Sequence, residues 1–230
     1  MELRKIATIY NNYTERFGIP RQSGIAPEVM SRIVFEKEYR NPDALRGIEG
    51  FSHLWLIWEF DRIERDAGYR PMVRPPKLGG NTRVGVWATR SPYRPNPLGL
   101  SVVRLVRVEQ TGEGPVLIVE GADLMNETPI YDIKPYVPYA DSIPDAVGGF
   151  ADEHAGDRLK VVIPAEVREE VIACGHDEAW LAALEKVLSA DPRPAYQDDP
   201  GRRYGMRYGD AEVSFSVDGT ELTVLSVVSV

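Results

Sequence analysis

Residues 54–60 read Leu-Trp-Leu-Ile-Trp-Glu-Phe, and this stretch decides the fold class. It is apolar at neighbouring as well as alternating positions, as expected of a strand that is buried on both faces. The connections at 74–81 and 91–97 contain glycines and prolines that exclude a helix interior there. Strand-like composition recurs on both sides of this stretch, at residues 4–10, 32–36, 84–89, 100–108, 116–120 and 130–134.

Many short strands with few long helices favour a barrel or a strongly curved sheet over roughly the first 145 residues. One short helix is predicted between the second and third strands, where Asn41 is an N-cap and Pro42 occupies the first helical position. No segment repeats at a fixed period, which argues against a solenoid or a propeller. The expected fold class is therefore mainly β, with a single β-barrel.

The pattern changes near Pro144. A stretch rich in Gly, Ala and acidic residues at 145–157 is predicted to be a linker or a long ordered loop. Helices are expected at 164–173 and 177–190, because their apolar residues recur at helical spacing, and strands at 203–208, 212–217 and 221–228. We therefore expect two domains, a β-barrel over residues 1–150 and a small α+β domain over residues 151–230. The second is rich in acidic residues and is not expected to supply the main phosphate-binding surface.

The composition is that of a soluble globular protein, with 43% hydrophobic and 27% charged residues in 230. No apolar run approaches the roughly 20 residues that span a bilayer, and no signal-peptide segment follows Met1, so a cytoplasmic location is expected. Cys174 is the only cysteine, which excludes an intramolecular disulfide and a cysteine-rich metal site. The three histidines are far apart in sequence, so no metal is expected.

Charge is segregated along the chain. Residues 62–107 contain ten basic side chains but only Glu64 and Asp66 as acidic ones, a local charge of +8 in a chain of net charge −8. Such segregation can give an acidic protein a positive face for phosphates. The alternative is a set of solvated arginines that never converge.

Several familiar catalytic motifs are missing. No G-x-G-x-x-G lies between a strand and a helix, and Gly112-Glu113-Gly114 between two strands is typical of a hairpin turn. There is no phosphate-binding Gly-Lys-Ser/Thr loop, and residues 50–54 lack the final glycine of a nucleophile elbow. Chemistry here must therefore use a diffusible reactive cofactor, or positioning alone.

Four segments combine sharp turns with charged or amide side chains. They are residues 20–24, 50–62, 74–99 and 121–136. The third contains Thr89-Arg90-Ser91-Pro92-Tyr93-Arg94-Pro95-Asn96-Pro97, and the fourth contains Asp132-Ile133-Lys134-Pro135-Tyr136. With a late Asp191-Pro192-Arg193-Pro194-Ala195-Tyr196, the chain resembles the TrmO family of tRNA methyltransferases, also called TsaA-like or YaeB-like.

The resemblance implies a β-barrel that binds S-adenosylmethionine (SAM) without a Rossmann sheet, a homodimer, and a tRNA substrate. It implies methylation of N6 of threonylcarbamoyladenosine, the modified base that follows the anticodon of threonine tRNAs. The cofactor residues expected on this basis are Gln22, Ser23, Gly24, Ile25, Asp61, Arg62, Arg90, Leu100, Glu120, Gly121, Ala122 and Asp123.

Physical reading assigns roles to some of these residues. Glycine at 24 permits close backbone approach to a ligand, and the planar guanidinium of Arg90 suits the SAM carboxylate. Leu100 would pack against adenine. The alternatives are a strand-end salt bridge for Arg90 and a turn cap for Asp123.

The resemblance also places catalytic and RNA-binding residues. The candidates for orienting or deprotonating N6 are Asn126, Tyr131, Asp132 and Lys134. An alternative of equal weight is that Asp132 and Lys134 form a buried pair that only holds the end of the strand. The expected substrate-binding residues are Arg70, Arg74, Lys77, Arg83, Arg94, Asn96, Arg193 and Tyr196. Competing hypotheses are a non-catalytic RNA- or nucleotide-binding module, and a SAM-dependent methyltransferase of another RNA or a small molecule.

Overall fold

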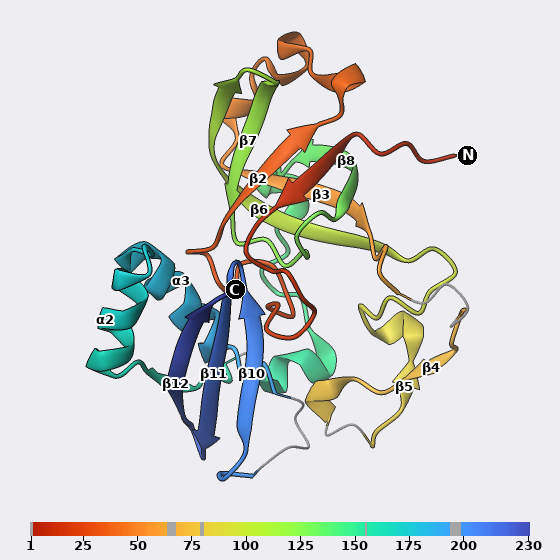
Figure 1. The fold of residues 1–230 in the computed structure, drawn as a ribbon. Coiled ribbons are helices and arrows are strands. Elements are labelled where there is room, and N and C mark those ends of the chain that lie inside the picture. Colours follow the sequence, from red (N-terminus) through yellow and green to blue (C-terminus); the bar gives the residue numbers. More distant parts are fainter. Residues whose placement is uncertain (1, 64–67, 79–80, 155, 194–198) are drawn as a thin grey trace.

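The fold is built around a six-stranded antiparallel sheet. A computed structural model describes residues 2–63, 68–78, 81–154, 156–193 and 199–230, without the side chains of Lys77 and His154. The sheet order is β1-β2-β7-β6-β3-β8, and β1 pairs with both β2 and β8, so the sheet closes on itself (Figure 1). Its strands are β1 (Ala7–Tyr10), β2 (Met30–Phe35), β3 (His53–Glu59), β6 (Leu98–Thr111), β7 (Gly114–Glu120) and β8 (Pro129–Pro135).

Alternate side chains of these strands fill the inside of the closed sheet. Leu54, Leu56 and Trp58 of β3 point inward with Val103 of β6 and Leu117 of β7, all almost fully buried. Because side chains alternate between the two faces of a strand, the neighbours of these residues in sequence lie on the outer face. The mainly β fold class is confirmed, as is the hairpin that joins β6 to β7 where Thr111 pairs with Gly114.

A second sheet follows in the C-terminal part of the chain, in the order β10-β11-β12-β9. Its strands are β9 (Lys160–Val162), β10 (Arg203–Tyr208), β11 (Ala211–Asp218) and β12 (Glu221–Ser229), with helices α2 (Ala165–Ala173) and α3 (Glu178–Ser189) beside them (Figure 1). Val171 of α2 and Leu184 of α3 are buried in one cluster with Phe215 and Val224 of the sheet. The two predicted helices are confirmed, and Asp177 caps α3 by accepting from the backbone N–H of Trp180 at 2.8 Å.

The remaining elements are short. β4 (Met72–Val73) pairs with β5 (Val84–Gly85), and α1 (Pro138–Asp141) follows β8. The short helix predicted near Asn41 is a 3₁₀ helix over Pro42–Leu45, and the Asn41 side chain caps it at 3.0 Å as expected. The other 3₁₀ helices in the described part of the chain are Lys37–Tyr39, Ile48–Gly50, Pro76–Leu78, Val86–Ala88 and Gly149–His154. Among the described residues, none of the helices combines the length and the apolar character that crossing a membrane requires.

One sequence-based prediction of local structure is wrong, and one strand was not predicted. The strand expected over 84–89 ends at Gly85, because the Thr89 backbone N–H and hydroxyl both donate to the Val86 carbonyl, at 3.1 and 2.9 Å, and close a turn. The short β9 falls between the predicted linker and the first predicted helix, where no element was predicted. It is a strand because it pairs in parallel with the distant β12.

The excursion between β1 and β2, residues 11–29, joins the two parts of the molecule. Tyr13, Ala26 and Val29 are buried in the cluster of the second sheet, and Phe17 and Ile19 pack against it. Tyr13 meets Tyr208 of β10 edge-on at 6.2 Å between ring centroids. The excursion that carries residues 22–25 therefore packs against the C-terminal sheet before the chain re-enters the closed sheet at β2.

Gly99 of β6 has no room for a side chain. A Cβ built there would lie 2.1 Å from Cε2 of the Trp58 indole, which packs across the neighbouring strand in register with it. The contact fixes the indole at the point where its Nε1 donates to the Ser101 hydroxyl at 2.9 Å.

Replacing Gly99 by Ala is expected to lower the free energy of unfolding by about 1–3 kcal/mol, because the added methyl group overpacks the core. Urea unfolding followed by fluorescence measures the change. The matched control is Gly205→Ala on β10, where a Cβ has no neighbour within 4 Å, and the expected change is at most about 1 kcal/mol in the stabilising direction. Equal effects of the two changes would contradict the proposed clash.

Candidate functional site

Two loops that are far apart in sequence meet at one end of the closed sheet. The Gly24 N–H donates to the Gly121 carbonyl at 2.8 Å, which joins the 11–29 excursion to the turn after β7. Both glycines have positive φ, 77° and 76°. A Cβ at Gly121 would lie 3.3 Å from the Gly24 Cα, so the close approach of the two backbones depends on glycine.

Asp123 is the buried acid of this junction. Its carboxylate accepts from the Ser101 hydroxyl at 2.5 Å, and that hydroxyl in turn accepts from Trp58 Nε1. Burial raises the pKa of Asp123, while hydrogen bonds from Ser101 and from the backbone of Ser23, together with the charge of Arg90, act to lower it. A partly desolvated carboxylate with a raised pKa at a loop junction is a frequent feature of functional sites.

Arg90 and Ser23 complete the junction. The Arg90 guanidinium donates to the side-chain carbonyl of Gln22, and the Ser23 hydroxyl accepts from the Val102 N–H of β6 at 3.3 Å. Arg90 is exposed, so its remaining donors face solvent. The structure thus brings together the predicted residues Gln22, Ser23, Gly24, Ile25, Arg90, Gly121, Ala122 and Asp123.

Three other predicted cofactor residues have neighbours different from those of Asp123. Leu100 pairs in register with Ile57 and stands on the outer face of β6, 55% exposed, on the face opposite to Ser101. Glu120 accepts from Arg104 at 2.7 Å. Arg62 donates to the Asn126 carbonyl at 2.7 Å and lies 3.5 Å from Glu127, close to the end of β3.

Asp61 lines a hollow of about 260 Å³ at the end of β3. Glu59, Phe60, Tyr69 and Arg94 also line it, so a predicted cofactor residue and a predicted substrate residue share one concave surface. Burial raises the pKa of Asp61, against the opposing effect of the Arg62 charge. Sequence reasoning missed Glu59 and Ser101, which look like ordinary strand residues until the folded chain places them in the hollow and beside Asp123.

The four predicted catalytic residues are divided between two places. Asn126 accepts from the Asn11 backbone N–H at 3.0 Å, and the Tyr131 hydroxyl donates to Glu59, which lines the hollow. Asp132 and Lys134 form an ion pair of 2.9 Å on the outer face of β8, with 45% and 62% of their side chains exposed. The structural pair considered in the sequence analysis therefore exists, but at the surface and not buried.

The predicted RNA-binding residues also differ in exposure. Arg70, Arg74, Arg83 and Asn96 are exposed, and Arg94 is half-buried. Arg70 stacks over the Tyr93 ring at 4.3 Å and Arg94 over the Trp87 ring at 5.2 Å. Arg193 is only 8% exposed. Tyr196 and the side chain of Lys77 lie outside the described residues. In the described part of the chain, no cluster of three or more His, Cys, Asp or Glu side chains could hold a metal ion.

Comparisons with known proteins place this arrangement in a family. The model of the tRNA-methyltransferase O N-terminal domain matches residues 8–142, and the model of the TrmO C-terminal domain matches residues 156–230. A tRNA (adenine(37)-N6)-methyltransferase of Escherichia coli K12 is 37% identical over 229 residues, covering 98% of this chain and 97% of that protein. A putative S-adenosylmethionine-dependent methyltransferase of Pseudomonas aeruginosa is 40% identical over 215 residues, covering 90% and 89%.

Solved structures agree with these matches. A crystal structure of TrmO from Pseudomonas aeruginosa superimposes with a TM-score of 0.79 at 32% identity, covering 100% of this chain and 99% of that one. Both the sequence and the fold are thus matched along almost the whole length. This chain belongs to the TrmO family of tRNA methyltransferases.

Proposed function

We propose that this protein is a SAM-dependent tRNA methyltransferase that acts on N6 of adenosine 37. The full-length match to a tRNA (adenine(37)-N6)-methyltransferase carries the proposal, because it covers both parts of the chain. The finer proposal is that the base is threonylcarbamoyladenosine in threonine tRNAs, and that the enzyme works in the cytoplasm. The exposed Arg74 and Arg83 are proposed to contact RNA phosphates.

The junction around Asp123 is proposed to hold SAM, with the closed sheet serving as a single SAM-binding barrel. When bound, SAM would supply an activated methyl group for transfer to N6. The residues fit such a ligand: Asp123 offers a carboxylate to a cationic group, and open space surrounds the position of a Gly24 Cβ. Arg90 keeps donors free for a carboxylate while it holds Gln22.

The hollow at the end of β3 is proposed to receive the modified base. Glu59 and Tyr131 form a hydrogen-bonded pair beside it, and Arg94 supplies a positive charge for the threonyl carboxylate. The N6 proton must leave as N6 is methylated. An N6–H next to a carbonyl group is more acidic than that of a plain exocyclic amine, so water can accept this proton and no strong base is required. The hydrogen bond from Tyr131 to Glu59 favours Tyr131 over the surface pair Asp132–Lys134 as the residue that orients N6.

We further infer a division into two domains, residues 1–150 and 151–230. Each range has its own sheet, and the two matched family models end and begin at 142 and 156. The apolar side chains of the 11–29 excursion bridge the two cores, so the domains are proposed to form one unit.

Methyl transfer is tested with threonine tRNA that carries the threonylcarbamoyl group, incubated with SAM and the protein. Nucleoside mass spectrometry is expected to show the mass of one added methyl group on that adenosine, and none on tRNA that lacks the modification. An unmethylated product despite saturable calorimetric binding of SAM would redirect the proposal to another substrate. A saturable RNA interaction without any SAM binding would favour a non-catalytic binding module.

Replacing Arg90 by Ala is expected to weaken SAM binding about 10- to 100-fold, as for the loss of hydrogen bonds to a charged group. Calorimetric titration with SAM measures this. The matched control is Arg83→Ala, another exposed arginine, which is expected to raise the KM for tRNA and leave SAM affinity unchanged. The assignment of Arg90 fails if its variant binds SAM as tightly as the wild type.

We also propose a homodimer that uses the outer face of β3 and β6. Leu98 and Leu100 are 36% and 55% exposed there, and exposed apolar patches mark protein interfaces. Sedimentation velocity is expected to give a dimer for the wild type and a monomer for Leu100→Arg. The control is Leu225→Arg on β12, 37% exposed, which is expected to stay dimeric. A monomeric wild type would refute this arrangement.

A further inference from the structure

Two aromatic side chains lie exposed beside the hollow at the end of β3. Tyr69 lines that hollow, and its ring stacks on Trp87 with 6.0 Å between the ring centroids and 27° between the ring planes. Tyr69 is 49% and Trp87 66% exposed, so their contact leaves most of the indole in solvent. Large aromatic side chains stabilise a fold by burial, and exposed apolar patches mark binding surfaces. The Tyr69–Trp87 pair is therefore a candidate surface for a ligand.

The backbone that carries Trp87 is held in place, although the indole itself is not packed. Trp87 is the middle residue of the 3₁₀ helix Val86–Ala88. Val86 is fully buried, and its N–H donates to the Pro71 carbonyl at 3.0 Å. Thr89 closes the helix by donating to the Val86 carbonyl. The fold thus presents an exposed indole from a fixed turn, as a preorganised binding surface does.

Positive charge lies next to the Tyr69–Trp87 pair. The Arg94 guanidinium is 5.2 Å from the centroid of the Trp87 ring, and Arg94 also lines the hollow. Arg70 follows Tyr69 directly, is exposed, and lies over the Tyr93 ring at 4.3 Å. A guanidinium keeps its charge when it lies over an aromatic ring. The exposed rings are therefore accompanied by two cations.

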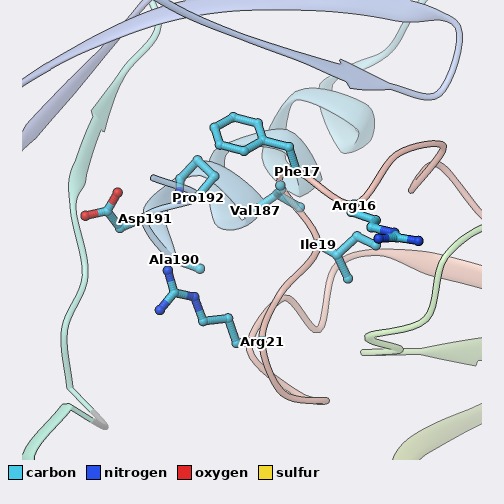
Figure 2. A pocket seen from close by; sticks show the side chains of 9 residues that line it. Arg16, Phe17, Ile19, Arg21, Val187, Ala190, Asp191 and Pro192 are labelled. Carbon is cyan, nitrogen blue, oxygen red and sulfur yellow. The ribbon is translucent and has the colours of Figure 1, made fainter. Parts of the chain in front are cut away.

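The 11–29 excursion contributes a third cation near the hollow. Arg16 is exposed, and Figure 2 shows its side chain extending away from Asp191 of the cavity between the excursion and the end of α3. Burial raises the pKa of Asp61, which lines the hollow, and the charges of Arg62 and Arg16 oppose this effect. Arg16 is thus close enough to the hollow to act on a carboxylate there.

We propose that the Tyr69–Trp87 pair is a stacking platform for an unpaired base of the RNA, the neighbour of the base that enters the hollow. Nucleobases stack on exposed aromatic rings, and nearby arginines interact with the phosphates of the strand. Tyr69 belongs both to the hollow and to the pair, so a strand with one base in the hollow brings the next base to Trp87. The inference rests on the proposed function for the identity of the RNA, and it assigns base recognition to two residues outside the basic set.

Fluorescence titration with single-stranded oligouridine of about six nucleotides tests the platform, because a base stacked on an indole quenches its emission. Oligouridine is expected to quench the wild-type protein saturably. An abasic strand of the same length carries the same phosphates and is expected to quench little. Trp87→Phe is expected to lose most of the quenching and to keep binding labelled oligouridine by fluorescence anisotropy, since phenylalanine keeps an aromatic face. Trp87→Leu is expected to bind about 5- to 100-fold more weakly.

Two further variants separate stacking from a general loss of apolar surface. Tyr69→Leu removes the ring that lies between the hollow and Trp87, and it is expected to weaken oligouridine binding as well. The matched control is Tyr139→Leu on α1. Tyr139 is 93% exposed, and no arginine in the described part of the chain stacks over its ring. This control is expected to bind oligouridine as the wild type does.

Methylation kinetics connect the platform with the reaction. Trp87→Leu is expected to raise the KM for tRNA and to leave kcat and SAM affinity unchanged, whereas a purely structural role would also lower the urea midpoint of unfolding. The proposal is overturned if Trp87→Leu binds oligouridine as tightly as wild type, or if the abasic strand quenches equally. It is also overturned if Trp87→Leu only converts a dimer into a monomer, because a second copy would then cover the pair. Failure of the methyltransferase assignment would instead appear as absent methylation while oligouridine still quenches Trp87.

Discussion

The hydrogen bond from the Gly24 N–H to the Gly121 carbonyl is the contact on which the arrangement of this molecule depends. β1 and β2 are neighbours in the closed sheet, with Ala7 opposite Phe35. The chain between them must therefore leave the sheet and rejoin it beside the strand that it left. On the way it buries Tyr13, Ala26 and Val29 in the other core. A side chain at Gly121 would press on the returning loop, and the positive φ at both Gly24 and Gly121 favours glycine.

The packing of this loop against Gly121 also explains why Asp123 is buried among several hydrogen-bond donors. The loop that packs on Gly121 also delivers the backbone of Ser23 to the carboxylate, and the closed sheet delivers the Ser101 hydroxyl from inside. Trp58 holds that hydroxyl, and Gly99 makes room for the indole. The acid of the proposed SAM site is thus positioned by the core of the sheet and not by the surface loops alone, which favours a fixed orientation.

Local sequence patterns predicted those helices and strands that are determined by interactions between residues close together in the sequence. The bounds of β10 agree with the expected strand. Helix α3 is only one residue shorter at each end than expected, because its cap at Asp177 and its apolar face lie within the same short segment. β9 and the turn at Val86–Ala88 were missed, because pairing with a distant strand and a side-chain hydrogen bond decide them. Motif resemblance brought together the residues around Asp123. It did not reveal that Leu100 faces outward or that Asp132 and Lys134 pair at the surface, because strand register sets these directions.

Charge counting along the sequence overstated the basic surface for a physical reason. Arg104 and Arg107 are paired with glutamates at the surface, so these two charges are offset locally, whereas Arg70 and Arg94 keep their charge while stacked on aromatic rings. Arg193, in a region of acidic composition, is likewise buried and paired with Asp191. What a nucleic acid can recognise is therefore set by which arginines lack an internal partner. Arg90 and Arg21 both have such a partner, since Arg90 donates to the Gln22 side chain and Arg21 to the Arg193 carbonyl, and both contacts hold the 11–29 excursion in place.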